Sequence, residues 1–471
     1  MPAQYLKQLG TEAVTRLRVA YVTSMLALIG AIVLLQTPQQ DARLGNSLRE
    51  QRAGWIYARL EGKPRDIGYQ YGYLLAPEID DAHRALKATD LGEKDWTWYR
   101  EEAKKLFWDK LDAEYQLELA GMAEGLVAKG YKYDVWDMLA FNSHIELGGY
   151  YLPWKKLQGG GGRVSGAKES CSAFVATGGH TKDGKVVMGH NLWWGYVMGQ
   201  RFNAMLDIRP EKGNRVLMDA LCGFIHSGSD FAINSAQLML CETTISDFFG
   251  FDPNGIPEFM RMRKAIQYAN NLDEMVAIFK KGNNGGYANT WLMADGKNGE
   301  IGKLELGLKN VNFNRTKDGY FAGANYPEDP KLIREEVTWF NPNPAQNGCM
   351  ARKLRWTTLM AEHKGTIDAT KAQAFLADTY NQVTGEKGAS GSTLCGRSDP
   401  YGALHGATSA RVATTDSVAK MSIWAKYGIP DGSELIAADF FQKFPRQKKP
   451  NEPYLRDIKA HPWVSFSVGG K

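Results

Sequence analysis

Cys171 is a candidate nucleophile that could be activated without a base from another residue. Cys171 opens the apolar run CSAFVATGG, directly after the glycine-rich segment GGGGRVSGAKES. If the chain were cut between Ser170 and Cys171, the new first residue would carry both a thiol and an α-amine. Their ordinary pKa values are about 8.5 and about 7.7 to 8.0, so the amine can take the thiol's proton near neutral pH. The clustered glycines 159–162 predict an exposed loop that would let the preceding peptide bend toward the thiol.

Other chemistries fit the sequence less well. A phosphate-binding loop needs Gly-Lys followed at once by Ser or Thr, but the segment GGRVSGAKES places Glu169 after Lys168. There is no His-Glu-x-x-His or Cys-x-x-Cys pattern, so no metal ion is expected. A cysteine protease pair between Cys171 and His190, His226 or His405 stays open, because such pairs form between distant positions.

The N-terminus predicts export. An uncharged stretch, residues 19–35, follows Lys7, Arg16 and Arg18. Residues 1–35 are therefore expected to be a cleaved signal peptide or, alternatively, a membrane anchor, with possible membrane association through 19–35. An exported protein would be secreted, periplasmic or in a lysosome-like lumen. Export permits disulfides, and the five cysteines allow up to two bridges beside a free Cys171, or five unpaired thiols.

Composition places the chain among globular proteins. Of 471 residues, 44% are hydrophobic, which is enough for one large core or two moderate ones. The formal net charge is +5, and the basic residues are scattered rather than clustered, so no nucleic-acid partner is expected.

The pattern of apolar residues changes at Cys171. From about residue 55 to 150 the period is helical, with Gly68 and Gly72 on one helical face, an interruption at Pro77 and a helix end at Gly130. After residue 171, short alternating segments predict strands, and further helices are expected in 257–281, 353–363 and 368–378. Blocks of helices between blocks of strands predict an α+β or layered fold.

The pairing register of the first two strands is left open by the turn signals. A wide loop at about residues 178–184 would place His190 and Asn191 opposite Cys171, whereas a tight Asp183-Gly184 turn would place Tyr196 there.

Several motifs in order resemble a known family. CSAFVATGG, GKVVMGHNLWW, LCETTIS, YANTWLMAD and GATSARVATTD resemble the phospholipase B-like proteins, a branch of the N-terminal nucleophile (Ntn) hydrolases, and EGKPRDIGYQYGYLLAPEI resembles the propeptide of penicillin acyltransferase-like peptidases. The resemblance implies a four-layer αββα sandwich of two antiparallel sheets between helices. Residues 36–170 would be a helical propeptide-like chain, and residues 171–471 the catalytic chain.

The resemblance also implies a set of site residues. Cys171 would be the nucleophile, exposed by self-cleavage after Ser170. His190 would be a second catalytic residue, at a position that follows the nucleophile in the phospholipase B-like branch. Trp193, Thr244 and Thr243 match substrate-binding positions, and alternation along the strand favours Thr244 over Thr243. Related cholylglycine hydrolases and ceramidases have Arg and Asp where this chain has His190 and Trp193, so their specificities do not carry over.

Two further roles follow from the same resemblance. Asn289 would stabilise the oxyanion through its amide. A late arginine is also expected, for which Arg315 and Arg411 are both candidates.

The sequence thus predicts a self-processing hydrolase of acyl amide or ester bonds that needs no cofactor. Its partner would be a small-molecule acyl amide or a lipid, and its substrate and oligomeric state are left open. The alternative is a non-catalytic lipid- or peptide-binding relative that has kept the fold and presents an aromatic surface around Trp96, Trp98 and Trp108.

Overall fold

The computed structural model describes residues 41–160, 171–397 and 404–467. Ser170, most of the predicted glycine loop and the apolar stretch 19–35 lie outside these ranges. The chain divides into two units, Met1–Gly45 and Asn46–Lys471. The short helix η1 (Ala42–Leu44) belongs to the first unit, and the fold below is that of the second.

In the described ranges, we find no helix with the length and apolar character needed to span a bilayer.

The larger of two sheets has nine strands and collects segments from both sides of Cys171. Its spatial order is β1 (Leu48–Arg52), β2 (Trp55–Gly62), β5 (Ala204–Pro210), β6 (Val216–Ala220), β7 (Ala232–Asn234), β8 (Leu238–Thr244), β9 (Asn289–Asp295), β10 (Glu300–Leu306), β11 (Val311–Thr316). Neighbouring strands run antiparallel except β2 and β5, which are parallel.

The smaller sheet begins at Cys171. Its order is β12 (Gly319–Gly323), β3 (Ser172–Gly178), β4 (Gly184–Gly195), β13 (His405–Thr414), β14 (Ser422–Tyr427), β15 (Val464–Ser467), all antiparallel. Strands β3, β4 and β13 lie side by side at its centre, so residues on these three strands can share one site.

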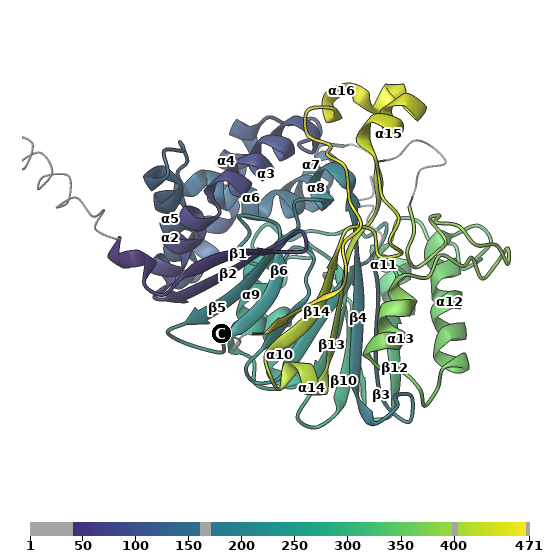
Figure 1. The fold of residues 1–471 in the computed structure, drawn as a ribbon. Helices are drawn as coiled ribbons and strands as arrows, with labels where there is room; N and C mark the ends of the chain where they lie inside the picture. The colour runs from purple at the N-terminus through teal and green to yellow at the C-terminus, as the bar shows by residue number, and fades with distance from the viewer. Residues whose placement is uncertain (1–40, 161–170, 398–403, 468–471) are drawn as a thin grey trace, which may run out of the picture. The chain divides into compact units, whose positions relative to one another are not determined.

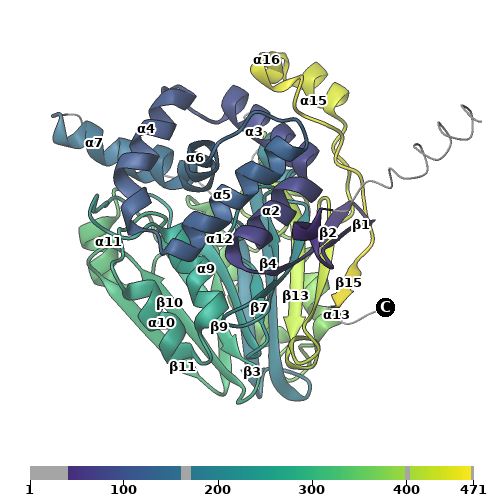
Figure 2. The same ribbon diagram turned by 90° about the vertical axis from the view of Figure 1, so that its left-hand side faces the viewer.

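Helices cover both outer faces of the two sheets (Figures 1 and 2). On the side of the larger sheet lie α2 (Pro64–Leu74), α3 (Ala76–Thr89), α4 (Trp96–Phe107), η2 (Trp108–Lys110), α5 (Ala113–Ala128), α6 (Val135–Glu146), the π-helical turn η3 (Leu147–Tyr151), α7 (Leu152–Gln158), α9 (Glu258–Tyr268) and α10 (Leu272–Lys280). The opposite side carries α12 (Gly348–Glu362) and α13 (Ala369–Leu376).

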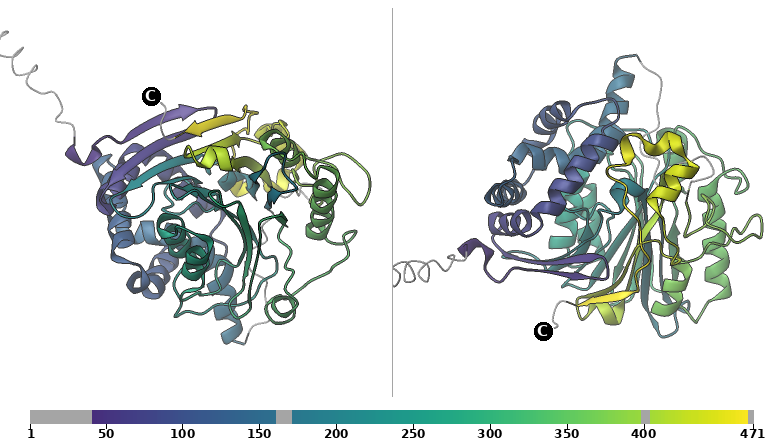
Figure 3. Two further views of the ribbon diagram at one scale, coloured as in Figure 1. Left: turned by 90° about the horizontal axis from the view of Figure 1, so that it is seen from below. Right: turned by 45° about the horizontal axis from the view of Figure 1, so that its top comes forward.

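The remaining helices are short connections or belong to the C-terminal segment. They are α8 (Tyr196–Gly199), α11 (Pro330–Glu336), α14 (Thr415–Val418), α15 (Ala437–Lys443), η5 (Pro445–Gln447) and α16 (Lys448–Asn451). The C-terminal helix α16 packs beside α3 (Figure 3).

Three apolar clusters confirm that the fold is α+β and layered. One cluster fills the space between the two sheets, with Val175 and Met188 from one sheet and Met239 and Leu292 from the other. A second lies between the larger sheet and its helices, and a third lies under α12 and α13. The order is therefore helices, sheet, sheet, helices, although the larger sheet is mixed rather than purely antiparallel.

The expectation of an all-helical N-terminal region is wrong for residues 48–62. These residues form β1 and β2, which join the larger sheet. Ile56 and Leu60 face its helices, whereas Trp55 contacts the core between the sheets, so β2 is covered on both faces. A strand buried on both faces lacks the alternation that reveals a strand in a sequence.

The aromatic surface expected around Trp96, Trp98 and Trp108 is also largely absent. Trp96 is buried, and its indole N–H donates to Asp137 Oδ1 over 2.8 Å. Trp98 and Trp108 are partly buried against the helical core. In this region the aromatic side chains pack the helices against one another.

The register of β3 and β4 is nearer to the wide-loop alternative but is shifted from it, because Asn191 is opposite Ser172 rather than Cys171. Ser172 is opposite Asn191, Ala173 is opposite His190, and Gly178 is opposite Gly184. This register places His190 one strand away from the start of β3. All five cysteines lie within the described residues and none forms a disulfide: Cys171, Cys222, Cys241 and Cys395 are buried, and Cys349 is half-buried.

Glycines allow α2 and α5 to touch backbone to backbone, as the spacing of Gly68 and Gly72 predicts. A Cβ atom on Gly68 would lie 1.9 Å from the carbonyl oxygen of Glu118, and one on Gly72 would lie 2.0 Å from that of Met122. From the other helix, a Cβ on Gly121 would lie 2.1 Å from Arg65 O. The two helices are in contact because side chains are missing from both.

We expect Gly68→Ala to lower the free energy of unfolding by at least about 2 kcal/mol, because the obstructing atoms are backbone and cannot turn aside. Urea denaturation of the full chain measures this change. The control is Gly391→Ala, where an added Cβ meets open space and should change stability by less than about 0.5 kcal/mol. Equal stability of the two variants would contradict this account of the helix contact.

Candidate active site

Cys171 lies at the head of β3, where both sheets contribute polar residues. Its side chain is fully buried. Its sulfur, a ring nitrogen of His190 and a carboxylate oxygen of Glu242 all lie within 4.8 Å of one another. His190 comes from β4 in the smaller sheet and Glu242 from β8 in the larger one. Three groups able to move or share a proton therefore meet at one point in the protein.

His190 is held as a neutral ring. It is fully buried, and burial lowers its pKa well below the usual value, with the nearby Arg411 guanidinium acting in the same direction. Among the described residues, neither ring nitrogen has a hydrogen-bond partner of good geometry. A neutral imidazole can donate one hydrogen bond and accept another, but it brings no charge to the site.

Of the two candidate arginines, only Arg411 lies near Cys171. It faces His190 across β13 and β4, and it forms an ion pair with Asp219 of β6 in which both side chains are fully buried. Burial lowers its pKa, and its attraction to Asp219 and to Cys171 opposes that effect. Arg315 is exposed and pairs with Asp273 on the surface, so the structure places it away from this group.

A second arginine, Arg352 of α12, holds the backbone at Cys171. Its Nη1 donates to the carbonyl oxygen of Cys171 over 2.6 Å and to Ser172 Oγ over 3.2 Å. The same guanidinium lies 5.0 Å from the ring centre of Trp193, and the Trp193 indole N–H donates to Leu394 O over 3.2 Å. These two contacts hold the Trp193 indole in place beside Arg352, with which it forms a cation–π contact.

Asn289 and Thr244 belong to a hydrogen-bond network centred on Glu242. With its amide nitrogen facing Glu242, Asn289 donates to Oε2 over 2.7 Å. Tyr287 lies between the others, with its hydroxyl 2.8 Å from Thr244 Oγ1 and 3.4 Å from Glu242 Oε1. In this chain the Asn289 amide donates to a carboxylate, so binding of an oxyanion there would have to replace Glu242.

The two adjacent threonines point in different directions, as strand alternation requires. Thr244 joins the Glu242 network, whereas Thr243 faces β12, where a Cβ added to Gly323 would lie 2.4 Å from its Oγ1. The role of Thr244 in substrate binding stays a prediction. Thr243 does not take part in the described network.

The same donors could bind a metal ion. One thiolate, one imidazole and one carboxylate are ligands that suit Zn²⁺. Of the three histidines considered as partners for Cys171, only His190 belongs to this group. His405 lies beside Trp193, with 6.3 Å between ring centres, and His226 stacks on Phe224.

Four residues of this site were not predicted from the sequence: Arg352, Glu242, Asp219 and Tyr287. Glu242 and Tyr287 lie inside the motifs CETT and YANTW, next to residues that were singled out. A charged residue within an apolar strand is the signal that could have found Glu242 and Asp219. Arg352 sits in an ordinary helix, and nothing in its local sequence marks it.

A cluster of buried carboxyl groups adjoins the Glu242 network. Glu146 at the end of α6 accepts a hydrogen bond from Asn284 Nδ2 over 2.5 Å, and burial raises its pKa to about 7. Burial also raises the pKa of Glu258 well above its usual range, with Asp230, Glu146 and Glu242 adding repulsion. The neighbouring Arg261 offsets part of this repulsion. Burial therefore favours the protonated form of these acids beside the site.

We expect Glu146→Gln to remove a pH-dependent loss of stability. Because the folded protein binds the Glu146 proton more tightly than the unfolded chain does, the stability it provides is present below pH 4.5 and is lost as pH rises through about 7. The variant should match the parent near pH 4.5 and exceed it by at most about 3 kcal/mol near pH 8.

Urea denaturation between pH 4.5 and 8 tests this, with both proteins carrying Cys171→Ala to exclude the cleavage expected from the sequence. Parallel stability curves for the two proteins would show that Glu146 does not hold a proton in the folded state.

Comparison with known proteins identifies the family. The profile of the phospholipase B family matches residues 78–334. An uncharacterized protein of Archaeoglobus fulgidus is 24% identical over 300 residues, which cover 59% of this chain and 47% of the relative. Phospholipase B-like 1 of Bos taurus is 24% identical over 287 residues, covering 53% of this chain and 49% of the relative. The chain thus spans about half the length of the curated relatives it matches. Since the family profile covers more than half of its residues, this chain belongs to the phospholipase B family.

Proposed function

We propose that this protein is a self-processing hydrolase of acyl ester or amide bonds, with Cys171 as an N-terminal nucleophile. The observation that carries the proposal is the position of Cys171. Cys171 directly precedes strand β3 and follows a glycine-rich segment. Its sulfur lies within 4.8 Å of a ring nitrogen of His190 and a carboxylate oxygen of Glu242. Membership of the phospholipase B family favours an acyl lipid as the substrate class.

Processing would begin within the chain. The Cys171 sulfur attacks the carbonyl carbon of Ser170, and the acyl group moves from nitrogen to sulfur, which frees the α-amine of Cys171. Water then hydrolyses this thioester, leaving a carboxylate on Ser170 and a free thiol on Cys171. Arg352, bound to the Cys171 carbonyl oxygen, would hold the backbone on the far side of the reacting bond.

Turnover would use the same sulfur. The α-amine takes the thiol proton as sulfur attacks the substrate carbonyl, then gives it to the departing alcohol or amine. Water hydrolyses the resulting thioester, which releases the fatty acid. Asn289 is proposed to stabilise the oxyanion after substrate displaces its contact with Glu242, while His190, Trp193 and Thr244 shape the site.

The buried state of Cys171 supports processing as the step that creates the active form. The thiol is fully buried in the intact chain, so an external substrate has no path to it. Cleavage after Ser170 would create two chain ends that can separate at this point. Export through residues 1–35 and a lumenal or extracellular location remain part of this proposal.

We expect mass spectrometry of the purified protein to give two fragments that meet at Ser170-Cys171, and Cys171→Ala to remain one chain without hydrolytic activity. Cys222→Ala is the matched control, because it removes a buried thiol that contacts Asn203 rather than a residue of the site, and it should be processed normally. An intact wild-type chain that hydrolyses phosphatidylcholine or an acyl amide would rule out the N-terminal nucleophile.

We expect Asn289→Ala to lower kcat on the order of 10² to 10³-fold, the usual effect of removing one oxyanion donor. KM should change little, since the donor acts on charge that develops in the transition state. Asn298→Ala, a change in a surface turn, serves as the control. Initial rates are measured on chains whose cleavage has been verified by mass. A processed Asn289→Ala enzyme with normal kcat would remove Asn289 from the mechanism.

A further inference from the structure

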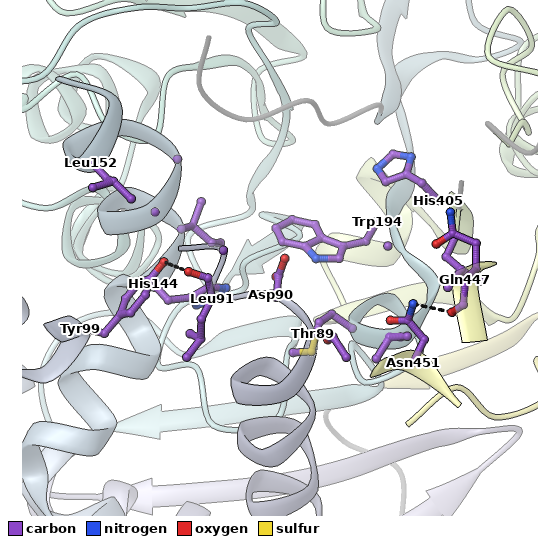
Figure 4. Close-up of a pocket in the computed structure, with 18 residues that line it drawn as sticks. Thr89, Asp90, Leu91, Tyr99, His144, Leu152, Trp194, His405, Gln447 and Asn451 are labelled. Atoms are coloured by element: carbon purple, nitrogen blue, oxygen red, sulfur yellow. Dashed lines mark hydrogen bonds between the residues drawn. The ribbon is translucent and has the colours of Figure 1, made fainter. Parts of the chain in front are cut away.

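A cavity of about 450 Å³ lies beyond the end of β4, outside the group around Cys171. The walls come from the end of α3, from α4, from the π-helical turn with its flanks, from the β4–α8 junction, from residues 404–405, and from η5 and α16 (Figure 4). Trp194 and Tyr99 contribute aromatic rings to its lining. Neither ring is needed by the proposed hydrolytic mechanism.

The cavity has one charged side chain in its described lining. Asp90 follows the last residue of α3, and its carboxyl group points toward the Trp194 indole (Figure 4). Within the described chain, no arginine, lysine or histidine forms an ion pair with Asp90, although Lys87 and Lys94 line the hollow on its other side. Asp90 is exposed to solvent, so its carboxylate is ionised at neutral pH.

Other groups in the lining add negative potential or stay neutral. Helix α3 has 14 residues, and its C-terminal end, the negative end of the helix dipole, is part of the wall. Burial lowers the pKa of both His144 and His405 to about 4, so neither histidine carries a positive charge near neutral pH. The described lining therefore offers a cation one carboxylate and the part of the buried Trp194 indole that lines the cavity, with no competing positive charge.

We propose that this cavity binds the alkylammonium headgroup of a phospholipid substrate, as found in choline or ethanolamine lipids. Aromatic rings attract such a cation through their electron-rich faces, and a carboxylate in the same cavity adds direct charge attraction. A metal ion fits less well, because Mg²⁺ and Ca²⁺ need several oxygen ligands and Asp90 supplies the one carboxylate. This inference rests on the proposed lipid hydrolysis.

The position of the cavity suits a headgroup whose ester lies at Cys171. In the β3/β4 register, Cys171 is level with about Leu192, so Trp194 lies roughly 7 Å further along β4. Contacts also connect the two places: the His405 ring is 6.3 Å from that of Trp193, which packs on Arg352, and Arg352 bonds the Cys171 carbonyl. A headgroup bound in the cavity would thus point its glycerol toward the thiol.

Binding of choline to the full-length protein, measured by calorimetry, tests the cavity without relying on turnover. The comparison ligand is 3,3-dimethyl-1-butanol, which has the shape of choline without its charge. We expect choline to bind at least about tenfold more tightly than this alcohol, and Asp90→Asn to abolish the difference. Trp194→Phe should keep most of the affinity and Trp194→Leu should lose it, because only the former keeps an aromatic face.

Glu101→Gln is the matched control, since it removes one exposed carboxylate from the neighbouring helix α4 and should leave choline binding unchanged. Equal binding of choline and the alcohol, or unaltered choline binding by Asp90→Asn, would overturn the inference.

A second measurement separates this inference from the proposed function. On vesicles of phosphatidylcholine and of phosphatidylglycerol, Asp90→Asn should raise KM at least about tenfold for the choline lipid and leave the glycerol lipid unaffected. Lipid hydrolysis with no Asp90-dependent headgroup preference would overturn the headgroup site alone. Choline binding that depends on Asp90, without hydrolysis of either lipid, would uphold the ammonium site and overturn the lipid hydrolase.

Discussion

The buried ion pair between Arg411 and Asp219 fixes the two sheets relative to each other at the site. The guanidinium comes from β13 of the smaller sheet and the carboxylate from β6 of the larger one, and both are fully buried. Such a pair adds little net stability, but separating its partners leaves a charge without compensation in the core. Ser229 also donates to Asp219 over 2.6 Å. His190 and the head of β3 are positioned beside this pair, so their geometry depends on it.

The N-terminal segment is part of the folded core rather than a detachable cover. Its strand β2 pairs with β5 along seven residue pairs, and its helices α2 and α5 meet through glycines. A cut after Ser170 would not break these contacts, because none of them involves the Ser170-Cys171 bond. The most direct consequence is local: the two new ends can part and expose Cys171, while the larger sheet keeps its N-terminal strands. This favours a retained chain over a released one.

Charged side chains are paired near Cys171, whereas the carboxylate in the cavity has no cationic partner among the described residues. Near Cys171, arginines and carboxylates are paired or bonded to the backbone, and His190 is neutral, so little net charge remains. In the cavity, Asp90 has no cationic partner among the described residues, and the aromatic rings around it are uncharged. A carboxylate without a cationic partner in the described protein is available to pair with a cationic ligand. This difference is the physical reason for assigning chemistry to one place and recognition to the other.

The sequence by itself determined the features that depend on neighbouring residues. It predicted the glycine contact at Gly68 and Gly72 and the change to strands at Cys171. His190 and Asn289 were expected from the family resemblance, and the fold brings them near this cysteine or its Glu242 neighbour. Only the tertiary structure decided which arginine lies near the thiol, that Arg352 holds its carbonyl, and that residues 48–62 enter the sheet. Those outcomes depend on how two sheets stack and on a parallel pairing between residues about 150 positions apart. Local periodicity carries no information about such distant partners.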